Sequence, residues 1–286
     1  MMKLETISEL RSRLDTPRRA GRRIGFVPTM GALHEGHRSL MRAARAECDV
    51  VVASIFVNPI QFGPGEDFEK YPRPIEMDLA ACREEGVDVV FVPRVDEIFP
   101  GGSVTKVTVA RLTEGLCGRH RPEHFDGVTT VVAKLFNIVQ PDRAYFGQKD
   151  AQQAAVIRRM VRDLNWSIEI VVCPTVREAN GLAMSSRNAY LSPEERKQAL
   201  CLGAALTWAK ERIESGERDV AGIVAGMRER IESAGECQVD YIEVVDADTL
   251  EPRRTVEGRC LLALAVQIGP ARLIDNVIVD AGGVGR

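Results

Sequence analysis

The feature that most constrains the fold is residues 49–57, a nearly uninterrupted run of β-branched and other apolar side chains. A strand that is apolar on both faces must be covered on both faces, and a parallel sheet meets this condition. A second apolar run, residues 87–92, follows further along the chain. Segments with helical spacing of apolar residues, 37–47 and 77–85, stand next to these runs.

The alternation of strand and helix continues from residue 23 to residue 172. Strands are predicted over residues 23–27, 49–57, 87–92, 143–146 and 168–172, and helices over 37–47, 77–85, 129–139 and 151–164. Repeated strand–helix–strand units require parallel pairing with right-handed crossovers. We therefore predict an α/β fold with a Rossmann-like, doubly wound parallel sheet, which binds ligands at the carboxyl ends of its strands.

The pattern changes near residue 177. A capping box with proline at the first helical position predicts a helix over 193–213, and a second helix is expected near 219–233. Strands over 239–245, 259–266 and 272–279 follow. Helices followed by strands indicate a smaller α+β domain. We predict a first domain over residues 1–177 and a second over 178–286.

Composition excludes some classes of function. A net charge of −3 and an aromatic content of 5% disfavour nucleic-acid binding, which needs a basic face and stacking side chains. The basic run at residues 18–23 is interpreted as a solvated approach to the first strand. Seven scattered cysteines without a C-x-x-C pair are typical of reduced thiols, and neither a signal peptide nor a bilayer-length apolar stretch is visible. We expect a cytoplasmic protein.

Residues 28–37 are the first stretch that suggests chemistry, because they follow a strand and enter a helix. Gly31 permits a tight turn, and the helix start offers N–H groups to an anion. His34 and His37 project from the same side of a helical turn. They could be structural, or bind zinc, although the spacing misses H-E-x-x-H. The strand–turn–helix setting favours a third hypothesis, a nucleotide-phosphate site in which imidazoles stabilise charge at phosphorus.

Two further polar stretches suit the same ligand. In residues 146–150, Lys149 supplies a point charge for phosphate and Asp150 can hold a ribose hydroxyl. In residues 184–188, two serines and Arg187 can clamp a triphosphate. Each stretch alone is typical of a solvated turn or linker, whereas the three together indicate a nucleotide site.

With these motifs the sequence resembles the pantothenate synthetase family, nucleotidyltransferases with HIGH and KMSKS-like motifs. Residues 34–37 (HEGH) stand at the HIGH position and residues 184–187 (MSSR) at the KMSKS position. Further matches, which extend over essentially the whole chain, are residues 28–37, 56–63, 121–128, 146–153 and 180–188. Departures from the family pattern are Gln148, where many members have glutamate, and Cys117.

The resemblance implies that ATP and Mg²⁺ drive the condensation of pantoate with β-alanine. Pantoate would attack the α-phosphorus to form an enzyme-bound pantoyl adenylate and pyrophosphate, and β-alanine would then displace AMP. The first domain would bind ATP and pantoate, and the second would be a lid that carries the KMSKS-like loop. The partners would be these small molecules and a second copy of the chain, with no nucleic acid and no membrane.

The same resemblance assigns site residues. The catalytic residues would be His37 as proton donor, His34 at the α-phosphate, and Lys149. The ATP site would comprise Met30, Gly31, Ala32, Leu33, His34, Glu35, Gly36, His37, Gly147, Gln148, Lys149, Asp150, Val176, Met184, Ser185, Ser186 and Arg187. Pantoate and β-alanine would meet amide side chains, which both donate and accept hydrogen bonds: Gln61, Gln153 and Asn58. Arg121 and His124 would belong to a gate loop, and no metal ligand is assigned.

Three other functions would each require features that differ from those of this sequence. A nucleotidyltransferase acting on a phosphate substrate would call for arginines where Gln61 and Gln153 stand. A truncated aminoacyl-tRNA synthetase would need a basic tRNA-binding domain. A non-catalytic nucleotide-binding protein would be expected to lack His34, His37 or Lys149, and all three are present.

Overall fold

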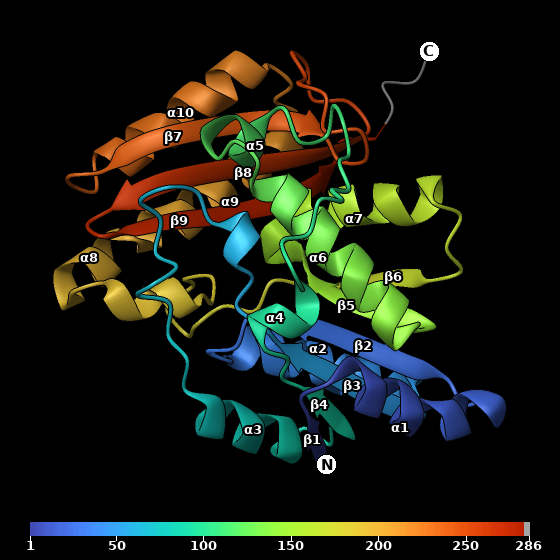
Figure 1. The fold of residues 1–286 in the computed structure, drawn as a ribbon. Helices are drawn as coiled ribbons and strands as arrows, with labels where there is room; N and C mark the ends of the chain where they lie inside the picture. The colour runs from blue at the N-terminus through green and yellow to red at the C-terminus, as the bar shows by residue number, and fades with distance from the viewer. Residues whose placement is uncertain (283–286) are drawn as a thin grey trace. The chain divides into compact units, whose positions relative to one another are not determined.

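A computed structural model describes residues 1–282, and the chain forms two compact units (Figure 1). Unit 1 comprises Met1–Ala110, Arg121–Gln148 and Val156–Pro174, and unit 2 comprises Arg111–His120, Lys149–Ala155 and the chain from Thr175 onward. The sequence suggested one boundary after residue 177, whereas two short earlier segments also belong to unit 2. Residues 283–286 of the expected second domain lie outside the described residues. Over residues 1–282, every helix is too short or too polar to span a bilayer.

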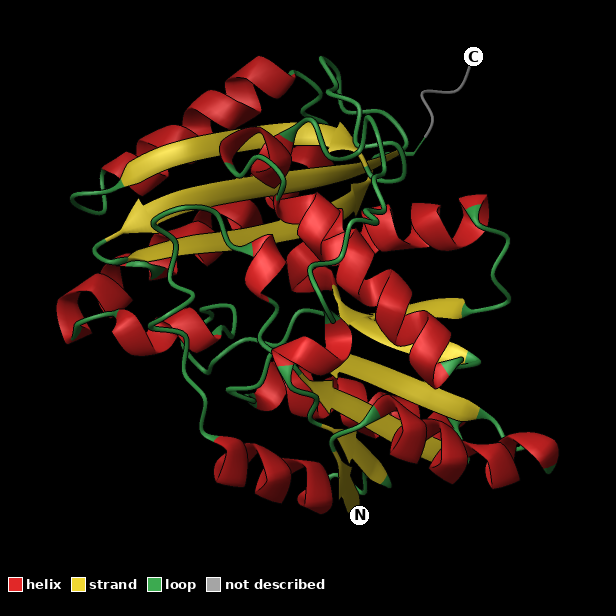
Figure 2. Ribbon diagram, viewed as in Figure 1, coloured by secondary structure: helices red, strands yellow, loops and turns green. Residues whose placement is uncertain are grey.

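Unit 1 is built on a six-stranded parallel sheet with the order β1-β4-β3-β2-β5-β6. Figure 2 draws the strands as yellow arrows. The strands are β1 (Met2–Leu4), β2 (Ile24–Thr29), β3 (Val50–Ile55), β4 (Val89–Phe91), β5 (Arg143–Gly147) and β6 (Glu169–Cys173). Every residue of β3 is buried, as expected for a strand covered on both faces. From β2 the chain proceeds through β3 to β4, and then resumes on the other side of β2 with β5 and β6. The predicted Rossmann-like sheet is confirmed, and its strand order reverses between β2 and β5.

Helices cover both faces of this sheet. They are α1 (Ile7–Arg19), α2 (Glu35–Glu47), α3 (Ile75–Glu84), α4 (Val95–Ile98), α6 (His124–Val139) and the part of α7 (Ala151–Asp163) that begins at Val156. Because side chains alternate along a strand, neighbours in β2 face opposite helices. Val27 packs with Met41 of α2 and Leu79 of α3. Phe26 meets Phe136 of α6 edge-on, with ring centroids 6.4 Å apart.

Unit 2 contains the antiparallel sheet β7-β8-β9 with helices packed on it. Its elements are α5 (Leu116–His120), α8 (Pro193–Gln198), α9 (Leu200–Glu214), α10 (Val220–Glu232), β7 (Gln238–Asp246), β8 (Arg259–Ile268) and β9 (Ala271–Asp280). Leu206 of α9 and Met227 of α10 pack against Leu262 and Leu264 of β8 in one buried core. The predicted small α+β unit is therefore confirmed as a fold class.

Three elements differ from their predicted extent. The helix expected over 193–213 is two helices, α8 and α9, which meet at buried Ala199; the amide of Gln198 donates to the Glu236 carbonyl at 2.6 Å where α8 ends. The helix expected from residue 129 begins at His124, because Glu123 has a left-handed backbone (φ 64°) that turns the chain into the helix. Strand β1 was missed, since three residues are too few to show a period.

Candidate functional site

The turn from Met30 to Leu33 connects the carboxyl end of β2 to α2, beside the reversal of strand order. Ligands bind at this position in doubly wound sheets. Gly31 has a φ of 82°, which glycine adopts freely. A Cβ at Gly31 would lie 2.8 Å from Oδ2 of Asp78 and 3.0 Å from Cγ2 of Ile55. The turn therefore requires glycine for its backbone angle and for space.

Buried side chains hold three consecutive N–H groups of this turn. Gly31 donates to Oγ1 of Thr29 at 3.2 Å, and Ala32 and Leu33 donate to the two carboxylate oxygens of Asp78 at 2.9 and 2.7 Å. Asp78 lies in α3 and is 2% exposed. Burial raises the pKa of its carboxyl, and the two N–H donors oppose that rise. Sequence reasoning missed Asp78, because its partners are 45 and 46 residues away.

The two histidines lie together at the start of α2, as their spacing predicts. His34 is the N-cap residue and His37 the third helical residue, with ring centroids 4.1 Å apart. Nδ1 of His34 accepts the N–H of Gly36 at 3.1 Å, and Nδ1 of His37 accepts the N–H of His34 at 3.3 Å. A neutral imidazole that accepts at Nδ1 carries its proton on Nε2. In their neutral forms both rings therefore carry an Nε2–H donor.

Gln61 and Asn58 lie just after β3, at the short helix η1 (Pro59–Gln61). Nε2 of Gln61 donates to Sδ of Met30 at 2.9 Å, and its Oε1 accepts from Nδ2 of Asn58 at 3.0 Å. The structure thus brings a predicted ATP residue and the two predicted pantoate residues of unit 1 together. Asn58 is 1% exposed, and within residues 1–282 its Oδ1 accepts no hydrogen bond. A buried acceptor of this kind is a place where a ligand hydroxyl can donate.

The first turn of α6 sets the position of Gln61. A Cβ on Gly127 would come within 2.3 Å of the Ile60 carbonyl oxygen, so only glycine allows this approach. The Gly127 carbonyl accepts from Nδ2 of Asn58 at 3.1 Å. The ring of His124 places Nδ1 2.8 Å from the carbonyl oxygen of Gln61. Two residues near the start of α6, His124 and Gly127, therefore hold the backbone that carries Gln61.

Arg121 closes this arrangement by pairing with Glu66 in the loop after η1. Nε and Nη2 of Arg121 donate to the two oxygens of Glu66 at 2.7 and 2.5 Å, and Nη1 lies 3.1 Å from Nε2 of His124. Burial would raise the pKa of Glu66, but the hydrogen bonds and charge of Arg121 outweigh it and hold that pKa below its usual range. Arg121 and His124 thus connect the 62–74 loop to α6. The spacing of Glu66 and Arg121, 55 residues, left no sequence signal.

In unit 2, Lys149 and Asp150 lie in the short helix η2 (Gln148–Asp150), and Gln153 lies in the first turn of α7. The Lys149 ammonium is 3.6 Å from Oδ1 of Asp150, with side-chain exposures of 19% and 46%. The carbonyl of Lys149 accepts from Nδ2 of Asn276 in β9 at 2.8 Å. Gly147 and Gln148 directly precede them, at the end of unit 1.

Two adjacent glutamines of α7 serve different purposes. Gln152 is buried: its Oε1 accepts the N–H of Cys117, and its Nε2 donates to the carbonyls of Leu112 and Gly115, all at 2.9 Å. Gln152 therefore anchors the segment 111–120 within unit 2. Gln153 is half-buried and has no such backbone partners among residues 1–282, which leaves its amide available to a ligand.

The MSSR segment follows a short hairpin in unit 2. Arg177 and Ala183 form an antiparallel bridge, and Met184 donates its N–H to the Val176 carbonyl at 3.0 Å. Two predicted ATP residues are thereby neighbours. Ser185 then caps the short helix η3 (Ser186–Tyr190), with its Oγ accepting the N–H of Arg187 at 3.3 Å.

Buried polar contacts support this hairpin, and sequence reasoning missed them. Arg177 donates to both carboxylate oxygens of Asp275 at 2.7 and 3.0 Å, and Asp275 is 3% exposed. Nδ2 of Asn188 donates to Oε1 of Glu178 at 3.1 Å and to the Ala183 carbonyl at 3.0 Å. The loop that carries the serines is therefore held at both of its ends.

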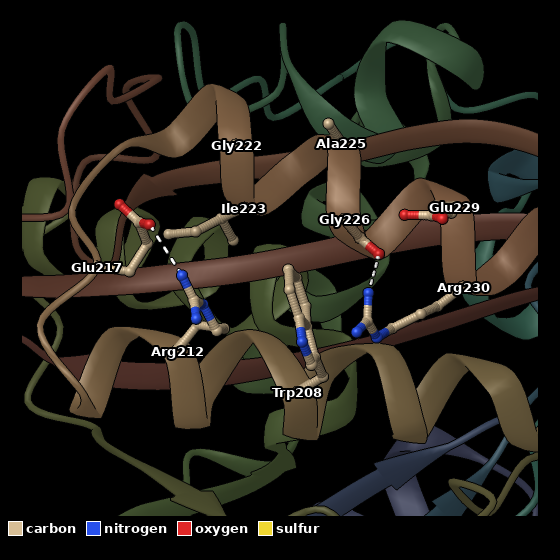
Figure 3. A pocket seen from close by; sticks show the side chains of 9 residues that line it. All are labelled: Trp208, Arg212, Glu217, Gly222, Ile223, Ala225, Gly226, Glu229 and Arg230. Carbon is tan, nitrogen blue, oxygen red and sulfur yellow. Dashed lines mark hydrogen bonds and ion pairs between the residues drawn. The ribbon is translucent and has the colours of Figure 1, made fainter.

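A pocket of about 610 Å³ between α9 and α10 contains none of the predicted site residues (Figure 3). The Trp208 ring lies against Gly226, where a Cβ would come within 2.1 Å of the ring. The Arg230 guanidinium covers the ring at 3.8 Å, and its Nη1 donates to the Gly226 carbonyl at 2.9 Å. These contacts explain the close packing of α9 and α10. The same side chains line the pocket, and we assign it no role in the reaction.

Comparisons with known proteins agree on one family. The family model described as pantoate-β-alanine ligase matches residues 2–278. Pantothenate synthetase from Acetivibrio thermocellus is 57% identical over 280 residues, 98% of this chain and all of that protein. The relative from Moorella thermoacetica is 58% identical over 277 residues, 97% of this chain and 98% of its own length.

Solved structures give the same result. The crystal structure of pantothenate synthetase from Thermus thermophilus has a TM-score of 0.92 at 49% identity, and covers 97% of this chain and 99% of that one. The Francisella tularensis pantoate-β-alanine ligase, complexed with β-γ ATP and β-alanine, has a TM-score of 0.82 at 34% identity and covers 97% of both chains. The chain therefore belongs to the pantoate-β-alanine ligase family and is an enzyme that ligates pantoate to β-alanine.

Proposed function

We propose that the enzyme activates pantoate with ATP as a bound pantoyl adenylate, which β-alanine then converts to pantothenate. The observation that carries this proposal is the contact between Met30, in the turn that leads to the two histidines, and the Gln61–Asn58 amide pair. Imidazole donors suit phosphate oxygens, and amides suit the hydroxyls and carboxylate of pantoate. The complex of the Francisella ligase with β-γ ATP and β-alanine supports the same substrates.

In the first step, a carboxylate oxygen of pantoate bonds to the α-phosphorus while the bond from that phosphorus to the bridging oxygen breaks, releasing pyrophosphate. Negative charge develops on the phosphoryl oxygens and on the leaving group. We assign the Nε2–H groups of His34 and His37 to the α-phosphate and the ammonium of Lys149 to the phosphates. Donors fixed in place before reaction stabilise this charge without reorganisation.

In the second step, the amine of β-alanine bonds to the acyl carbon of the adenylate, and the bond from that carbon to the AMP oxygen breaks. The amine attacks in its neutral form, and the proton that the nitrogen loses as the amide forms passes to solvent. We assign the β-alanine amine to Gln61, and pantoate to Gln61, Asn58 and Gln153. No covalent enzyme intermediate is needed, because the mixed anhydride is itself the activated acyl group.

The remaining ATP contacts that we propose come from several segments of the chain. We propose that residues 30–37, with Gly147 and Gln148, contact the nucleotide from unit 1, and that Lys149 and Asp150 hold phosphates and ribose. Val176 would contact adenine, and residues 184–187 the triphosphate. The hydrogen-bonded hairpin under the MSSR segment supports this role, and residues 178–286 would act as a lid.

The proposed reaction is tested by product formation from ATP, Mg²⁺, D-pantoate and β-alanine, followed by mass spectrometry with each component omitted in turn. Pantothenate and AMP should appear only in the complete mixture. Without β-alanine, a stoichiometric pantoyl adenylate should remain on the enzyme. Amide formation without ATP, or ADP in place of AMP, would contradict the adenylate route.

Replacing Gln153 with alanine should raise the KM for pantoate by about 5- to 30-fold, the cost of one or two lost hydrogen bonds to a charged ligand. The KM for ATP should change less than about twofold, because Gln153 is assigned to the acid and not to the nucleotide. Steady-state kinetics with each substrate varied separately measures both constants. The matched control is Gln267→Ala, whose amide bonds to the Gly269 carbonyl. Equal changes in both constants for Gln153→Ala would disprove the assignment.

We propose Mg²⁺ as the ion that accompanies ATP and neutralises its phosphate charge. Residues 1–282 contain no cluster of three His, Cys, Asp or Glu side chains that could hold a metal ion. Mg²⁺ that accompanies a nucleotide is typically bound by phosphates and water, with one or two carboxylates from the protein. Of the two acids in the proposed ATP set, Glu35 pairs with Arg42, whereas Asp150 is half-exposed beside Lys149. Asp150 is therefore the acid of this set that we also propose for the ion, in addition to its proposed contact with ribose.

Removal of the ion with excess EDTA should abolish adenylate formation, and added Mg²⁺ should restore it. Residual turnover would be measured by pyrophosphate release over a titration of EDTA, with the free-metal concentration calculated at each point. Undiminished turnover at full chelation would exclude the requirement. The Asp150→Asn variant should need a higher Mg²⁺ concentration for half-maximal rate.

We also propose that the enzyme is a homodimer in the cytoplasm. The family resemblance supports a dimer through the N-terminal unit, and light scattering of the purified chain would measure its mass. Seven cysteines among the described residues are free thiols, which supports a reducing compartment. A monomeric mass in light scattering would refute the homodimer. Export of the intact chain from the cell would refute the cytoplasmic location.

A further inference from the structure

The carboxylate of Asp78 is unusual among the acids of unit 1 in its burial and its partners. Asp78 is 2% exposed, and across residues 1–282 its partners are the N–H groups of Ala32 and Leu33, one for each oxygen, with no ion pair. Both oxygens therefore point at the turn that precedes His34. Among the residues that we propose as substrate contacts, only Ala32 and Leu33 form hydrogen bonds with Asp78.

A buried carboxylate without a cationic partner is costly, so its two N–H bonds must compensate for lost hydration. Such charge-assisted bonds are stronger than neutral ones. An asparagine of the same shape would accept only one of them, because its NH₂ group would face the other N–H. The arrangement therefore requires an aspartate rather than any polar residue that fits the space.

The turn needs this support, because Ala32 has a φ of 50°, a left-handed conformation that residues other than glycine rarely adopt. The two N–H groups that Asp78 binds bracket this strained position. On one side, Met30 contacts Gln61; on the other, His34 caps α2 and pairs with His37. A shift of the turn would thus move both the histidine donors and Met30.

We infer that Asp78 is a positioning residue for ATP: it holds the turn between β2 and α2 in the strained form that aims the two histidines. This inference rests on the proposed role of residues 30–37 in ATP binding. Asp78 does not touch substrate in this assignment and acts through the backbone of Ala32 and Leu33. Its effect is therefore expected mainly on ATP and on adenylate formation, and far less on pantoate, which is assigned to Gln61, Asn58 and Gln153 on other segments.

The test is Asp78→Asn in the full-length chain. The kcat/KM for ATP should fall by about 10- to 100-fold, the loss expected for a charge-assisted hydrogen bond replaced by two facing N–H groups. The KM for pantoate should stay within about twofold. The matched control is Asp142→Asn: Asp142 also receives a backbone N–H of β2, that of Ile24 at 2.6 Å, but at the opposite end of the strand. Both constants should be unchanged in the control.

Equal losses for ATP and pantoate, or no loss in a folded Asp78→Asn variant, would overturn the inference. Should the variant not fold, amide hydrogen exchange on the unaltered chain tests the same contact. The N–H groups of Ala32 and Leu33 should then be strongly protected, and exchange as fast as in an open loop would overturn it. If the proposed function itself is wrong, both His37→Ala and Asp78→Asn should leave the use of ATP unchanged. Failure of the inference alone leaves His37→Ala slow and Asp78→Asn normal.

Discussion

Replacing His37 with alanine is expected to slow adenylate formation by about 10²- to 10³-fold, the usual cost of one preorganised donor at a reacting centre. The structure gives the reason: Nδ1 of His37 is occupied by the N–H of His34, so the neutral ring offers Nε2–H to the phosphate. The fold should survive. Loss of the cap costs about 1 kcal/mol, which lowers Tm by roughly 2–4 °C in a chain of this size.

Rapid-quench measurement of pantoyl adenylate in a single turnover separates this effect from product release. The control is His120→Ala: this ring lies 5.7 Å from that of Tyr241 and has no proposed role in the reaction. It should form adenylate at the normal rate. A His37→Ala enzyme with near-normal single-turnover rate would remove His37 from the chemistry, whatever its effect on KM.

The second large effect is expected for Lys149→Ala, which should also lose about 10²- to 10³-fold in adenylate formation. Lys149 is the cation of the proposed phosphate contacts in η2, and its side chain is only 19% exposed, so little water replaces the lost charge. The backbone should stay in place, because Asn276 binds the carbonyl of Lys149 and not its side chain.

Pyrophosphate release in the presence of saturating pantoate measures this loss, and circular dichroism melting checks the fold. Lys210→Ala is the control: its exposed ion pair with Glu214 at 3.7 Å is worth at most about 0.5 kcal/mol. Lys149→Arg should recover only part of the rate, because a planar guanidinium cannot reproduce a point charge. A fully active Lys149→Ala enzyme would show that the phosphates are neutralised elsewhere.

Local patterns in the sequence were sufficient for most of the fold. Residues 49–57 are apolar on both faces, which is typical of a strand inside a parallel sheet; the structure buries all of β3. The capping box of Thr6 and Glu9 at the start of α1 is local in the same way, because both of its partners lie within one turn. The sequence did not predict helix ends that contacts with distant residues set. At Ala199 the helix predicted over residues 193–213 divides into α8 and α9.

The candidate site divides in the same way. The contiguous motifs, residues 34–37 and 184–187, are visible in the sequence because helix geometry and turn chemistry act over a few residues. The pairing of the histidine rings follows from their spacing alone. By contrast, nothing near Gln61 in the sequence indicates that Gly127 and His124 hold its backbone, since these partners come from another helix.

The sequence by itself therefore determined the order of strands and helices, the turn at Gly31 and the residues that can carry phosphate chemistry. Only the tertiary structure decided which side chains hold these segments in place. Asp78 binds the N–H of Leu33, Glu66 pairs with Arg121, and Asp275 pairs with Arg177, across 45, 55 and 98 residues of sequence. Each is a single charged side chain with no periodic pattern. A buried charge is stable only where folding brings its hydrogen-bond partner to it, and that meeting is a property of the packed chain.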